Sequence, residues 1–343
     1  MRTLPTPRIP EPDTAPALNW GILGAGGIAR RFTAAVNTFT ASRVAAVGSR
    51  TPDKGEAFAA AHGIAKSYTS YEQLVSDPEI DAVYVATTHN DHHTPAALAL
   101  EAGKPVLVEK AFTLNSAQAN AVVELARERN LALMEAMWTR FLPRTDIVRQ
   151  LLADGTLGEI FWLEADHGQP LQHVRRLTDP TLGGGALLDL GVYPISYAVF
   201  ALGIPSGVRA VGEKGESGAD AQDFVLLDGF ADHPRAKAAI SCSSFAKTPT
   251  TASICGADAR VFLPGDFYTP GVVELRDNAG WTAVSPMPTL TRHLGMAYEA
   301  AEFARVVKEG RTESTLMPWA ETLAVMGIMD ECRRQMGVVY PGE

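Results

Sequence analysis

The sequence predicts an α/β protein in which a Rossmann-type doubly wound parallel sheet precedes an α+β domain with a large, mostly antiparallel open sheet. Three observations carry this prediction. The length of 343 residues suits two domains. Up to Phe141, short apolar strands alternate with helical segments, which is typical of a parallel sheet. Beyond that residue, strands follow one another with turn residues between them, which is typical of an antiparallel sheet.

The first half of the chain gives the clearest alternation. The expected strands are 18–23, 44–48, 82–86, 105–108 and 132–134. The expected helices are 28–36, 51–62, 70–76, 94–102 and 116–129. Thr51 and Pro52 form a typical helix start, and Gly63 can take the left-handed conformation that ends a helix.

The second half changes rhythm after one helix at 144–153. The expected strands are 160–165, 208–212, 223–230, 236–244, 251–255, 259–262 and 272–276. A helix is expected at 185–192, and two more, at 297–308 and 318–335, close the chain. The domains expected from these elements are an arm at 1–17, a dinucleotide-binding domain at 18–138 and a substrate-binding and dimerisation domain at 139–343.

Composition narrows the class of partner. A formal net charge of −9 leaves no basic excess to neutralise nucleic-acid phosphates. No apolar run approaches the ~18 residues that cross a bilayer. Residues 1–17 hold five prolines and no apolar core, so we expect an extended arm, disordered or laid on a neighbouring subunit, and not a signal peptide. The three cysteines lack CxxC spacing, which indicates reduced thiols in a cytoplasmic enzyme.

The first strand runs into a dinucleotide-binding signature of the form G-x-G-x-x-A. Gly24 permits the tight turn, and Gly26 lets the backbone approach a pyrophosphate without an intervening Cβ. Ala29 lets the helix pack closely on the strand, and the helix N-terminus faces the anion. The strand–turn–helix context supports the motif. The expected contacts in this turn are Gly24, Ala25, Gly26, Gly27 and Ile28.

The end of the second strand favours NADP over NAD. NAD enzymes usually place Asp or Glu there to hold the ribose 2′-hydroxyl. This chain has Ser49 and Arg50, with Lys54 one turn into the next helix. A hydroxyl and two cations suit a 2′-phosphate, so we expect NADP as cofactor, with NAD possible.

Three further segments follow parallel strands, where ligands of such sheets bind. They contain Thr87, Thr88 and His89, then Glu109 and Lys110, then Trp138 and Arg140, and all are expected to contact the cofactor. Trp138 would also flank the substrate and exclude water around it, and Arg140 could bind a carboxamide or phosphate. A core role is the alternative for Trp138.

The order and spacing of several motifs resemble the Gfo/Idh/MocA oxidoreductase family. They are the glycine fingerprint, the histidine-bearing loop, "AGKPVLVEKA" and "GGGALLDLGVYP". The segment "EAMWTRFLP" and a tyrosine after "DLG" are similar to the branch of dihydrodiol dehydrogenases and NADP-dependent D-xylose dehydrogenases. The resemblance covers residues 18–340 and implies that Lys110 is the catalytic lysine. Family members usually carry proline where this chain has Ala111, and that proline often shapes the loop through a cis bond.

Asp189 and Tyr193 are the catalytic and substrate-binding candidates of the second domain. Their i, i+4 spacing on the expected helix puts both on one face. A free phenol has a pKa near ~10, and a neighbouring ammonium such as Lys110 would lower it, so that Tyr193 could take a hydroxyl proton. Asp189 would orient Lys110 or a substrate hydroxyl. A core aromatic with a satisfied hydroxyl is the alternative for Tyr193.

The histidines invite a metal interpretation that the spacing does not support. His89 and His93 are four residues apart and Asp91 adds a carboxylate, but the further ligands of a zinc site are missing nearby. We therefore expect no metal. The family resemblance implies that His92 helps to position substrate or cofactor, with a packing role as the alternative. Asp166 and His167, at a strand end of the second domain, are expected to contact substrate.

The expected activity is NADP-linked hydride transfer at a CH–OH or CH–CH group of a sugar, an inositol or a trans-dihydrodiol. Two alternatives share the fold: a glycoside hydrolase that uses a dinucleotide transiently, and a non-enzymatic NADP-binding sensor. By family analogy, we expect a homodimer or a dimer of dimers through the second sheet, with no membrane or nucleic-acid partner.

Overall fold

The computed structural model describes residues 4–341 and 343. Its two compact units are each discontinuous in sequence. The parallel-sheet unit consists of Pro10–Phe141 and Arg292–Trp319, and the open-sheet unit contains Leu142–Thr291, Ala320–Glu343 and the N-terminal residues up to Ile9. The predicted domain boundary at residue 138 thus lies close to Phe141, where the parallel-sheet unit first ends. A single boundary omits Arg292–Trp319, which returns to that unit.

The parallel-sheet unit holds six parallel strands in the order β3-β2-β1-β4-β5-β6. They are β1 (Asn19–Leu23), β2 (Arg43–Gly48), β3 (Lys66–Tyr68), β4 (Ala82–Val85), β5 (Val106–Glu109) and β6 (Leu133–Ala136). From β1 the chain adds β2 and β3 on one side, and it then returns to add β4, β5 and β6 on the other side. Ligands of such sheets bind at this switch point between β1 and β4. The sequence did not predict β3, because this half-exposed edge strand has no apolar run.

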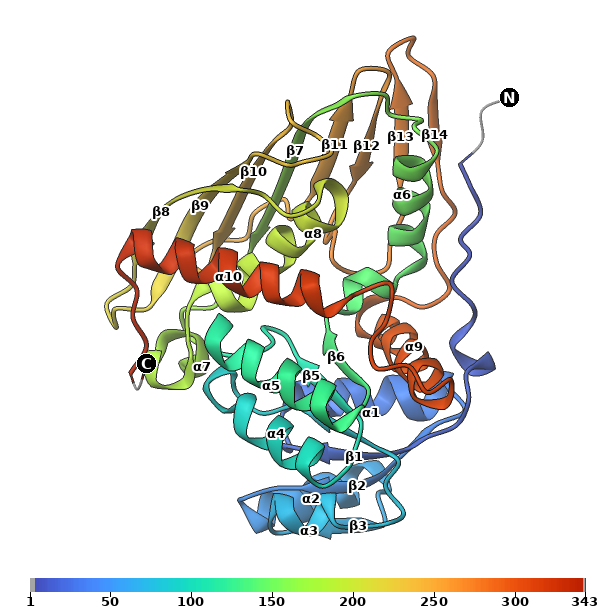
Figure 1. Ribbon diagram of the computed structural model, residues 1–343, viewed down its shortest axis with the longest axis vertical. Coiled ribbons are helices and arrows are strands. Elements are labelled where there is room, and N and C mark those ends of the chain that lie inside the picture. The colour runs from blue at the N-terminus through green and yellow to red at the C-terminus, as the bar shows by residue number, and fades with distance from the viewer. Residues whose placement is uncertain (1–3, 342) are drawn as a thin grey trace. The chain divides into compact units, whose positions relative to one another are not determined.

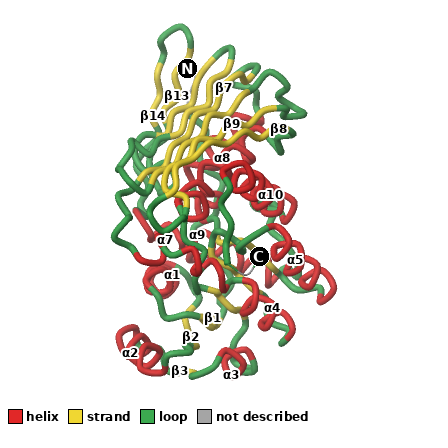
Figure 2. Tube along the Cα trace, turned by 90° about the vertical axis from the view of Figure 1, so that its left-hand side faces the viewer, coloured by secondary structure: helices red, strands yellow, loops and turns green. Residues whose placement is uncertain are grey.

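Helices cover both faces of this sheet. They are α1 (Gly27–Phe39), α2 (Pro52–His62), α3 (Tyr71–Val75), α4 (His93–Glu101) and α5 (Ser116–Arg129). Figure 2 shows α1 and α2 on one side of β1 and β2 and α3, α4 and α5 on the other. Gly63 ends α2 with a φ of 65°, as predicted. Short 3-10 turns follow β4 and β6, at η2 (His89–Asp91) and η3 (Trp138–Phe141).

The returning segment completes the core of this unit. It contains η6 (Arg292–Gly295) and α9 (Met296–Lys308), which packs against α1. The ring centroids of Trp20 and Phe303 lie 5.5 Å apart. The indole N–H of Trp319 donates to the carbonyl oxygen of Leu133 at 2.8 Å. Residues near the end of the chain therefore fix the first strand and the last strand of the sheet.

The open-sheet unit holds eight strands in the order β14-β13-β12-β11-β7-β10-β9-β8 (Figure 1). They are β7 (Ile160–Gly168), β8 (Gly207–Lys214), β9 (Asp220–Asp228), β10 (Lys237–Ser243), β11 (Ala252–Gly256), β12 (Ala259–Leu263), β13 (Glu274–Asp277) and β14 (Thr282–Val284). All pairs are antiparallel except β7 with β10. The predicted antiparallel sheet is confirmed, and β14 is an addition.

The open-sheet unit also contains helices, of which the π-helix and α8 pack against the sheet. They are α6 (Pro143–Ala153), α7 (Arg175–Thr178), a π-helix (Leu187–Gly191), α8 (Val192–Leu202) and α10 (Trp319–Met336). The helix predicted at 185–192 was too short, because the π-helix leads directly into α8, which packs against β7 and β10. Pro180–Leu202 is apolar and long enough to cross a membrane, but 94% of its most apolar stretch is buried within the fold. This segment is a core element.

The N-terminal arm, as far as the structure describes it, is ordered against its own chain. The backbone N–H of Arg8 donates to the Asp146 carboxylate at 2.7 Å, and Gln150 donates to the carbonyl oxygen of Thr6 at 2.9 Å. Further on, Arg305 donates to the carbonyl oxygen of Glu11 at 3.1 Å. These residues are therefore not a disordered arm, and the contact with a neighbouring subunit stays a prediction.

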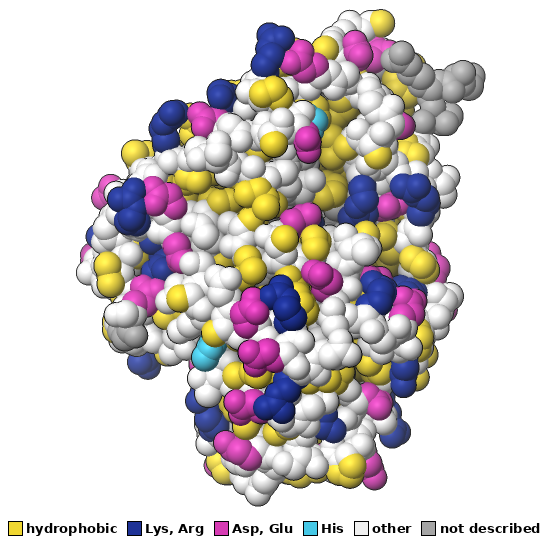
Figure 3. Space-filling model, viewed as in Figure 1, with side chains coloured by type: hydrophobic (Ala, Val, Ile, Leu, Met, Phe, Trp, Pro, Cys, Tyr) yellow, Lys and Arg dark blue, Asp and Glu magenta, His cyan; other side chains and the backbone are white. Residues whose placement is uncertain are grey.

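Charges of both signs are mixed on the surface that Figure 3 shows. Lys and Arg side chains alternate with Asp and Glu across this view, outside the atoms drawn in grey. A nucleic-acid-binding face would instead gather basic groups on a patch or stripe. The distribution agrees with the acidic net charge of −9.

Candidate functional site

The glycine turn after β1 has the geometry of an anion site. Gly24 has a φ of +104°, and a Cβ built there would lie 2.7 Å from the carbonyl oxygen of Ala86. Gly26 is the N-cap of α1 and makes no side-chain cap, so the first N–H groups of the helix are not bonded by a capping side chain. A Cβ at Gly26 would meet nothing closer than 3.8 Å. These features fit a dinucleotide pyrophosphate, which such N–H groups bind.

The residues after β2 differ in how they can serve a ligand. The Ser49 hydroxyl donates to the carbonyl oxygen of Thr51 at 2.9 Å and accepts its N–H at 3.2 Å. Ser49 is buried, so it shapes the turn from within. The Arg50 side chain is 64% exposed and pairs with Asp91 at 2.6 Å. Arg50 is therefore the group of this turn that a phosphate could reach.

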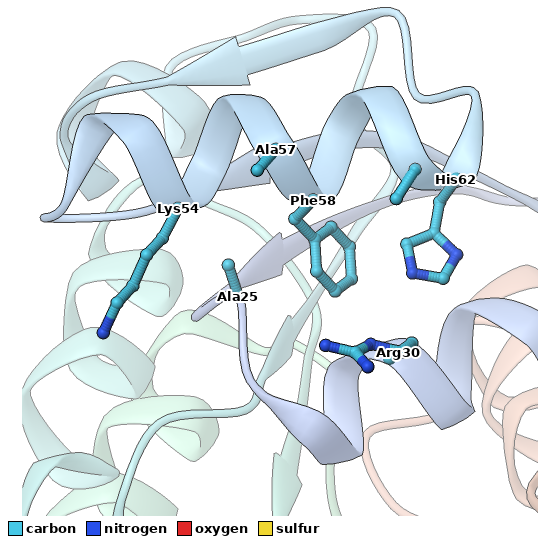
Figure 4. Close-up of a pocket in the computed structure, with 7 residues that line it drawn as sticks. Ala25, Arg30, Lys54, Ala57, Phe58 and His62 are labelled. Carbon is cyan, nitrogen blue, oxygen red and sulfur yellow. The ribbon is translucent and has the colours of Figure 1, made fainter.

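Lys54 lines a cavity of about 610 Å³ between α1 and α2. Figure 4 shows Ala25 at the turn, Lys54 on α2, and the Arg30 guanidinium below the Phe58 ring. The cavity is positively charged through Arg30 and Lys54 and begins beside the glycine turn. These two cations suit an anionic part of a cofactor.

Lys110 follows β5 and is half-buried. The peptide bond between Lys110 and Ala111 is cis, so alanine here has the bond geometry expected of the usual proline. His92 holds the loop at this bond, because its Nδ1 lies 2.8 Å from the carbonyl oxygen of Ala111. The aim of Lys110 therefore depends on contacts from the loop after β4.

The position of His92 gives it a supporting role. It is 1% exposed, and its second ring nitrogen lies 3.3 Å from the carbonyl oxygen of Thr87. Burial lowers the pKa of His92 to about 4, so the imidazole is neutral. One nitrogen then carries a proton, and the shorter contact identifies Nδ1–H as the donor to Ala111. These contacts give His92 a part in holding the lysine loop from the interior, and its contact with substrate or cofactor stays a prediction.

The neighbouring residues of this loop also act on the backbone. The Thr87 hydroxyl donates to the carbonyl oxygen of Asp91 at 2.7 Å, and the Thr88 hydroxyl contacts Asn90 at 2.6 Å. His89 is 6% exposed and meets the edge of the His92 ring at a centroid distance of 5.7 Å. Within the described residues no three His, Cys, Asp or Glu side chains gather as metal ligands.

Glu109 holds the backbone at Lys110. Its carboxylate accepts a hydrogen bond from the Tyr84 hydroxyl and another from the backbone N–H of Lys110, the latter at 3.2 Å. Glu109 is 5% exposed, and its negative charge helps burial to raise the pKa of the nearby Glu299 well above its usual range. Glu109 therefore acts on Lys110 through the backbone.

Trp138 stacks on His293, a residue that sequence reasoning missed. The ring centroids lie 5.5 Å apart and the planes differ by 9°. Arg31 of α1 donates to His293 Nε2 at 2.6 Å. Burial lowers the pKa of His293 to about 4, with smaller effects from the charges of Arg31 and Lys110. A neutral imidazole thus lies near Lys110, although 183 positions separate the two in the sequence.

Arg140 belongs to the interior of η3. It is only 1% exposed, so its guanidinium faces protein groups. The expected contact of Arg140 with a carboxamide or phosphate stays a prediction. Phe141 and Trp138, its neighbours in η3, are buried with it.

Tyr193 lies in an aromatic cluster of the open-sheet unit. Its ring centroid is 5.3 Å from that of His167 and 4.8 Å from that of Tyr268. The Gln169 amide donates to His167 Nε2 at 2.9 Å and to the Tyr268 hydroxyl at 3.1 Å. Two predicted residues, His167 and Tyr193, are therefore brought together. Gln169 and Tyr268 were missed, since a loop tyrosine and glutamine carry no motif.

Asp189 sits in the π-helix and forms a two-point ion pair. Arg176 of α7 approaches its two carboxylate oxygens at 3.0 and 3.4 Å. At the start of this helix, the N–H of Leu187 donates to the buried Asp220 at 2.6 Å. The π-turn places Asp189 and Tyr193 in one continuous helical segment, and such turns are frequent at functional sites.

Asp166 faces away from this cluster. Its carboxylate accepts the N–H groups of Thr250 and Thr251 at 2.7 and 2.9 Å. Because side chains alternate along a strand, Asp166 and His167 point to opposite faces of the sheet. The structure thus separates these two predicted substrate contacts and gives Asp166 a role in holding the start of β11.

Comparison with known proteins places this geometry in context. Residues 18–137 match the model described as "Oxidoreductase family, NAD-binding Rossmann fold", and residues 146–262 match the GFO/IDH/MocA C-terminal domain. Trans-1,2-dihydrobenzene-1,2-diol dehydrogenase of Danio rerio is 37% identical over 334 residues, covering 94% of this chain and 98% of that protein. The protein of the same name from Homo sapiens is 35% identical over 333 residues, covering 95% and 98%.

Solved structures agree with these relatives. KijD10, a 3-ketoreductase from Actinomadura kijaniata in complex with NADP and TDP-benzene, has a TM-score of 0.81 at 26% identity, covering 94% of this chain and 98% of that one. An NAD binding oxidoreductase from Klebsiella pneumoniae has a TM-score of 0.83 at 20% identity, covering 94% and 100%. The latter supports the fold alone.

Proposed function

Because the chain belongs to the GFO/IDH/MocA family of oxidoreductases, we propose that it is an NADP-dependent oxidoreductase acting on a small hydroxylated substrate. The substrate class is a sugar, an inositol or a trans-dihydrodiol, or the corresponding carbonyl compound. The dihydrodiol dehydrogenase relatives and the NADP complex of KijD10 support this choice.

One observation carries the proposal: α1 starts behind a glycine turn without a side-chain cap, and cations follow the neighbouring strand. Gly24 through Ile28 would hold the pyrophosphate at the helix N-terminus. Arg50 and Lys54 would meet the 2′-phosphate, since positions 48–50 contain no carboxylate. This arrangement favours NADP and leaves NAD as a weaker ligand.

The residues around Lys110 prepare a site for a hydride carrier. When bound, the nicotinamide supplies or accepts the hydride. Glu109 and His92 fix the backbone on either side of Lys110, which limits the directions its ammonium can take. The stacked Trp138 and His293 form an apolar wall that excludes water.

We assign to Tyr193 the role of taking the proton from the substrate hydroxyl. Tyr193 is 7% exposed and is held by His167 and Tyr268, so its hydroxyl has a fixed direction. A phenol needs a nearby positive charge to act as a base at neutral pH. The family resemblance makes Lys110 the catalytic lysine, and Asp189 would orient a substrate hydroxyl.

A substrate panel tests this function. Sugars, inositols and trans-dihydrodiols are supplied with NADP⁺, and the near-ultraviolet absorbance of NADPH is followed. We expect turnover on at least one class, and we expect Lys110→Ala to retain NADP⁺ binding while losing most of the turnover. Hydrolysis of an aryl glycoside to the free phenol and the sugar without net NADPH formation, or binding without turnover across the panel, would contradict the proposal in favour of a hydrolase or a sensor.

The exposed face of the open sheet supports a homodimer or a dimer of dimers. The side chains of Trp162, Val211, Phe224 and Val284 are 41–69% exposed. The strand register places all four on the sheet face opposite α8. Val211 and Phe224 are direct cross-strand neighbours. Large apolar side chains exposed on one sheet face support an interface, and a second copy of this chain is the proposed partner.

A reducing compartment suits the cysteines. Cys242, Cys255 and Cys332 are all free thiols. Burial raises the pKa of Cys242 and that of Cys332, the latter to about 12, which keeps both protonated and unreactive. We therefore propose a cytoplasmic location.

A further inference from the structure

The Arg50–Asp91 ion pair lies where the cofactor's adenosine half is proposed to bind. Arg50 follows β2, and Asp91 ends the short turn after β4. Strand β1 lies between β2 and β4 in the sheet, so the pair joins the two loops that flank the glycine turn. Nη2 of Arg50 lies 2.6 Å from Oδ2 of Asp91.

The two partners differ in freedom. The Asp91 side chain is 17% exposed, whereas that of Arg50 is 64% exposed and lies over the Tyr71 ring at 5.3 Å. The backbone of Asp91 is fixed by Thr87, whose hydroxyl donates to its carbonyl oxygen, and by Thr88, whose carbonyl oxygen accepts its N–H at 2.8 Å. The carboxylate is therefore the anchored partner, and it determines where the guanidinium rests.

The chemistry of the two dinucleotides makes this pair selective. A 2′-phosphate is an anion, so it must draw Arg50 away from Asp91 and then lie near the remaining carboxylate. The 2′-hydroxyl of NAD carries no charge and can donate a hydrogen bond to a carboxylate. Asp91 therefore opposes the phosphorylated cofactor without opposing the other.

We propose that Asp91 is a specificity-determining residue that limits the preference for NADP over NAD by competing with the 2′-phosphate for Arg50. This inference rests on the proposed function, because it assumes that the turn at Gly24–Gly27 binds a nicotinamide dinucleotide. The cations after β2 are one determinant of this preference, and Asp91 adds a second on the loop after β4.

Calorimetric titration of NADP⁺ and NAD⁺ into wild-type protein and Asp91→Asn tests this role without measuring activity. The variant should bind NADP⁺ roughly three- to tenfold more tightly, the range that a half-exposed ion pair and one screened repulsion allow. Binding of NAD⁺ should stay the same or weaken. Glu101→Gln is the matched control, because it removes one carboxylate at the opposite end of α4 and should change neither dissociation constant by more than about twofold.

A double-variant cycle shows whether Asp91 acts through Arg50. In an Arg50→Ala background, Asp91→Asn should no longer improve NADP⁺ binding. An unchanged ratio of the two dissociation constants in Asp91→Asn, or an equal gain with and without Arg50, would overturn the competition. A wild-type protein that binds neither dinucleotide would overturn the proposed cofactor as well, so the two failures are distinguishable.

Discussion

At the scale of single residues, the candidates divide into groups that can meet a ligand and groups that hold them in place. Lys110 is half-buried at a strand end, and Tyr193 lies in an aromatic cluster. His92, Glu109 and Gln169 instead direct their polar atoms at backbone or side-chain groups of the protein. His92, Glu109 and Gln169 determine the geometry of the candidate site. Variants of these residues should therefore change turnover more than cofactor binding.

Replacing His92 by Phe tests the first supporting contact. The change removes the hydrogen bond to Ala111 and loosens the loop that aims Lys110. We expect kcat to fall roughly 10- to 100-fold, as a misplaced catalytic group does, while NADP⁺ affinity stays within about threefold. His233→Phe, in the turn between β9 and β10, should leave both unchanged. Unaltered kcat in His92→Phe would show that the loop holds its shape without this contact.

The buried neutral His92 also predicts how stability depends on pH. An unfolded histidine takes up its proton near pH ~6.5, whereas His92 in the folded protein does so near 4. Between these values the unfolded state binds more protons, so the free energy of unfolding falls as the pH falls. Denaturant unfolding at pH ~7 and ~5 should show wild-type protein losing about 2 kcal/mol more than His92→Phe. An equal loss in both would contradict a neutral His92.

At the scale of elements, the glycine turn allows binding and folding to be separated. Gly26→Ala meets no close atom in the protein, so its unfolding free energy should change by less than about 1 kcal/mol, yet its Cβ would lie where the pyrophosphate approaches. We expect its dissociation constant for NADP⁺ to rise at least about tenfold. Gly24→Ala should instead lose about 2 kcal/mol or more of stability, since its φ is +104° and its Cβ would strike Ala86. Calorimetry and thermal melting of the two variants check this contrast.

Elements with strong periodicity were predictable from the sequence, and those set by tertiary contacts were not. Helix α5 was predicted to the residue, because Asn115 caps it and its apolar positions repeat regularly. The π-helix was missed, because its extra residue per turn is fixed by partners such as Asp220 and not by local pattern. The role of Trp138 depends on His293, which has no motif of its own. The site candidates were therefore found where strands end, and their supporting partners were not.

At the scale of the whole molecule, the exposed sheet face predicts the oligomeric state. We expect light scattering after gel filtration to give at least a dimer for the wild-type protein. Phe224→Asp combined with Val211→Asp should shift the mass to that of a monomer, because two charges would be desolvated in the interface. Val339→Asp is the control, since Val339 is 74% exposed but lies outside the sheet. A wild-type monomer would exclude this interface.

The central claim is that this chain moves a hydride between a carbinol carbon and a phosphorylated nicotinamide. The most direct measurement uses a substrate from the active class carrying deuterium at that carbon and follows the mass of the dinucleotide after a single turnover. We predict that the deuterium appears on the reduced cofactor, and that Lys110→Ala transfers it at least ~100-fold more slowly. Product formation with no label on the dinucleotide would contradict the account.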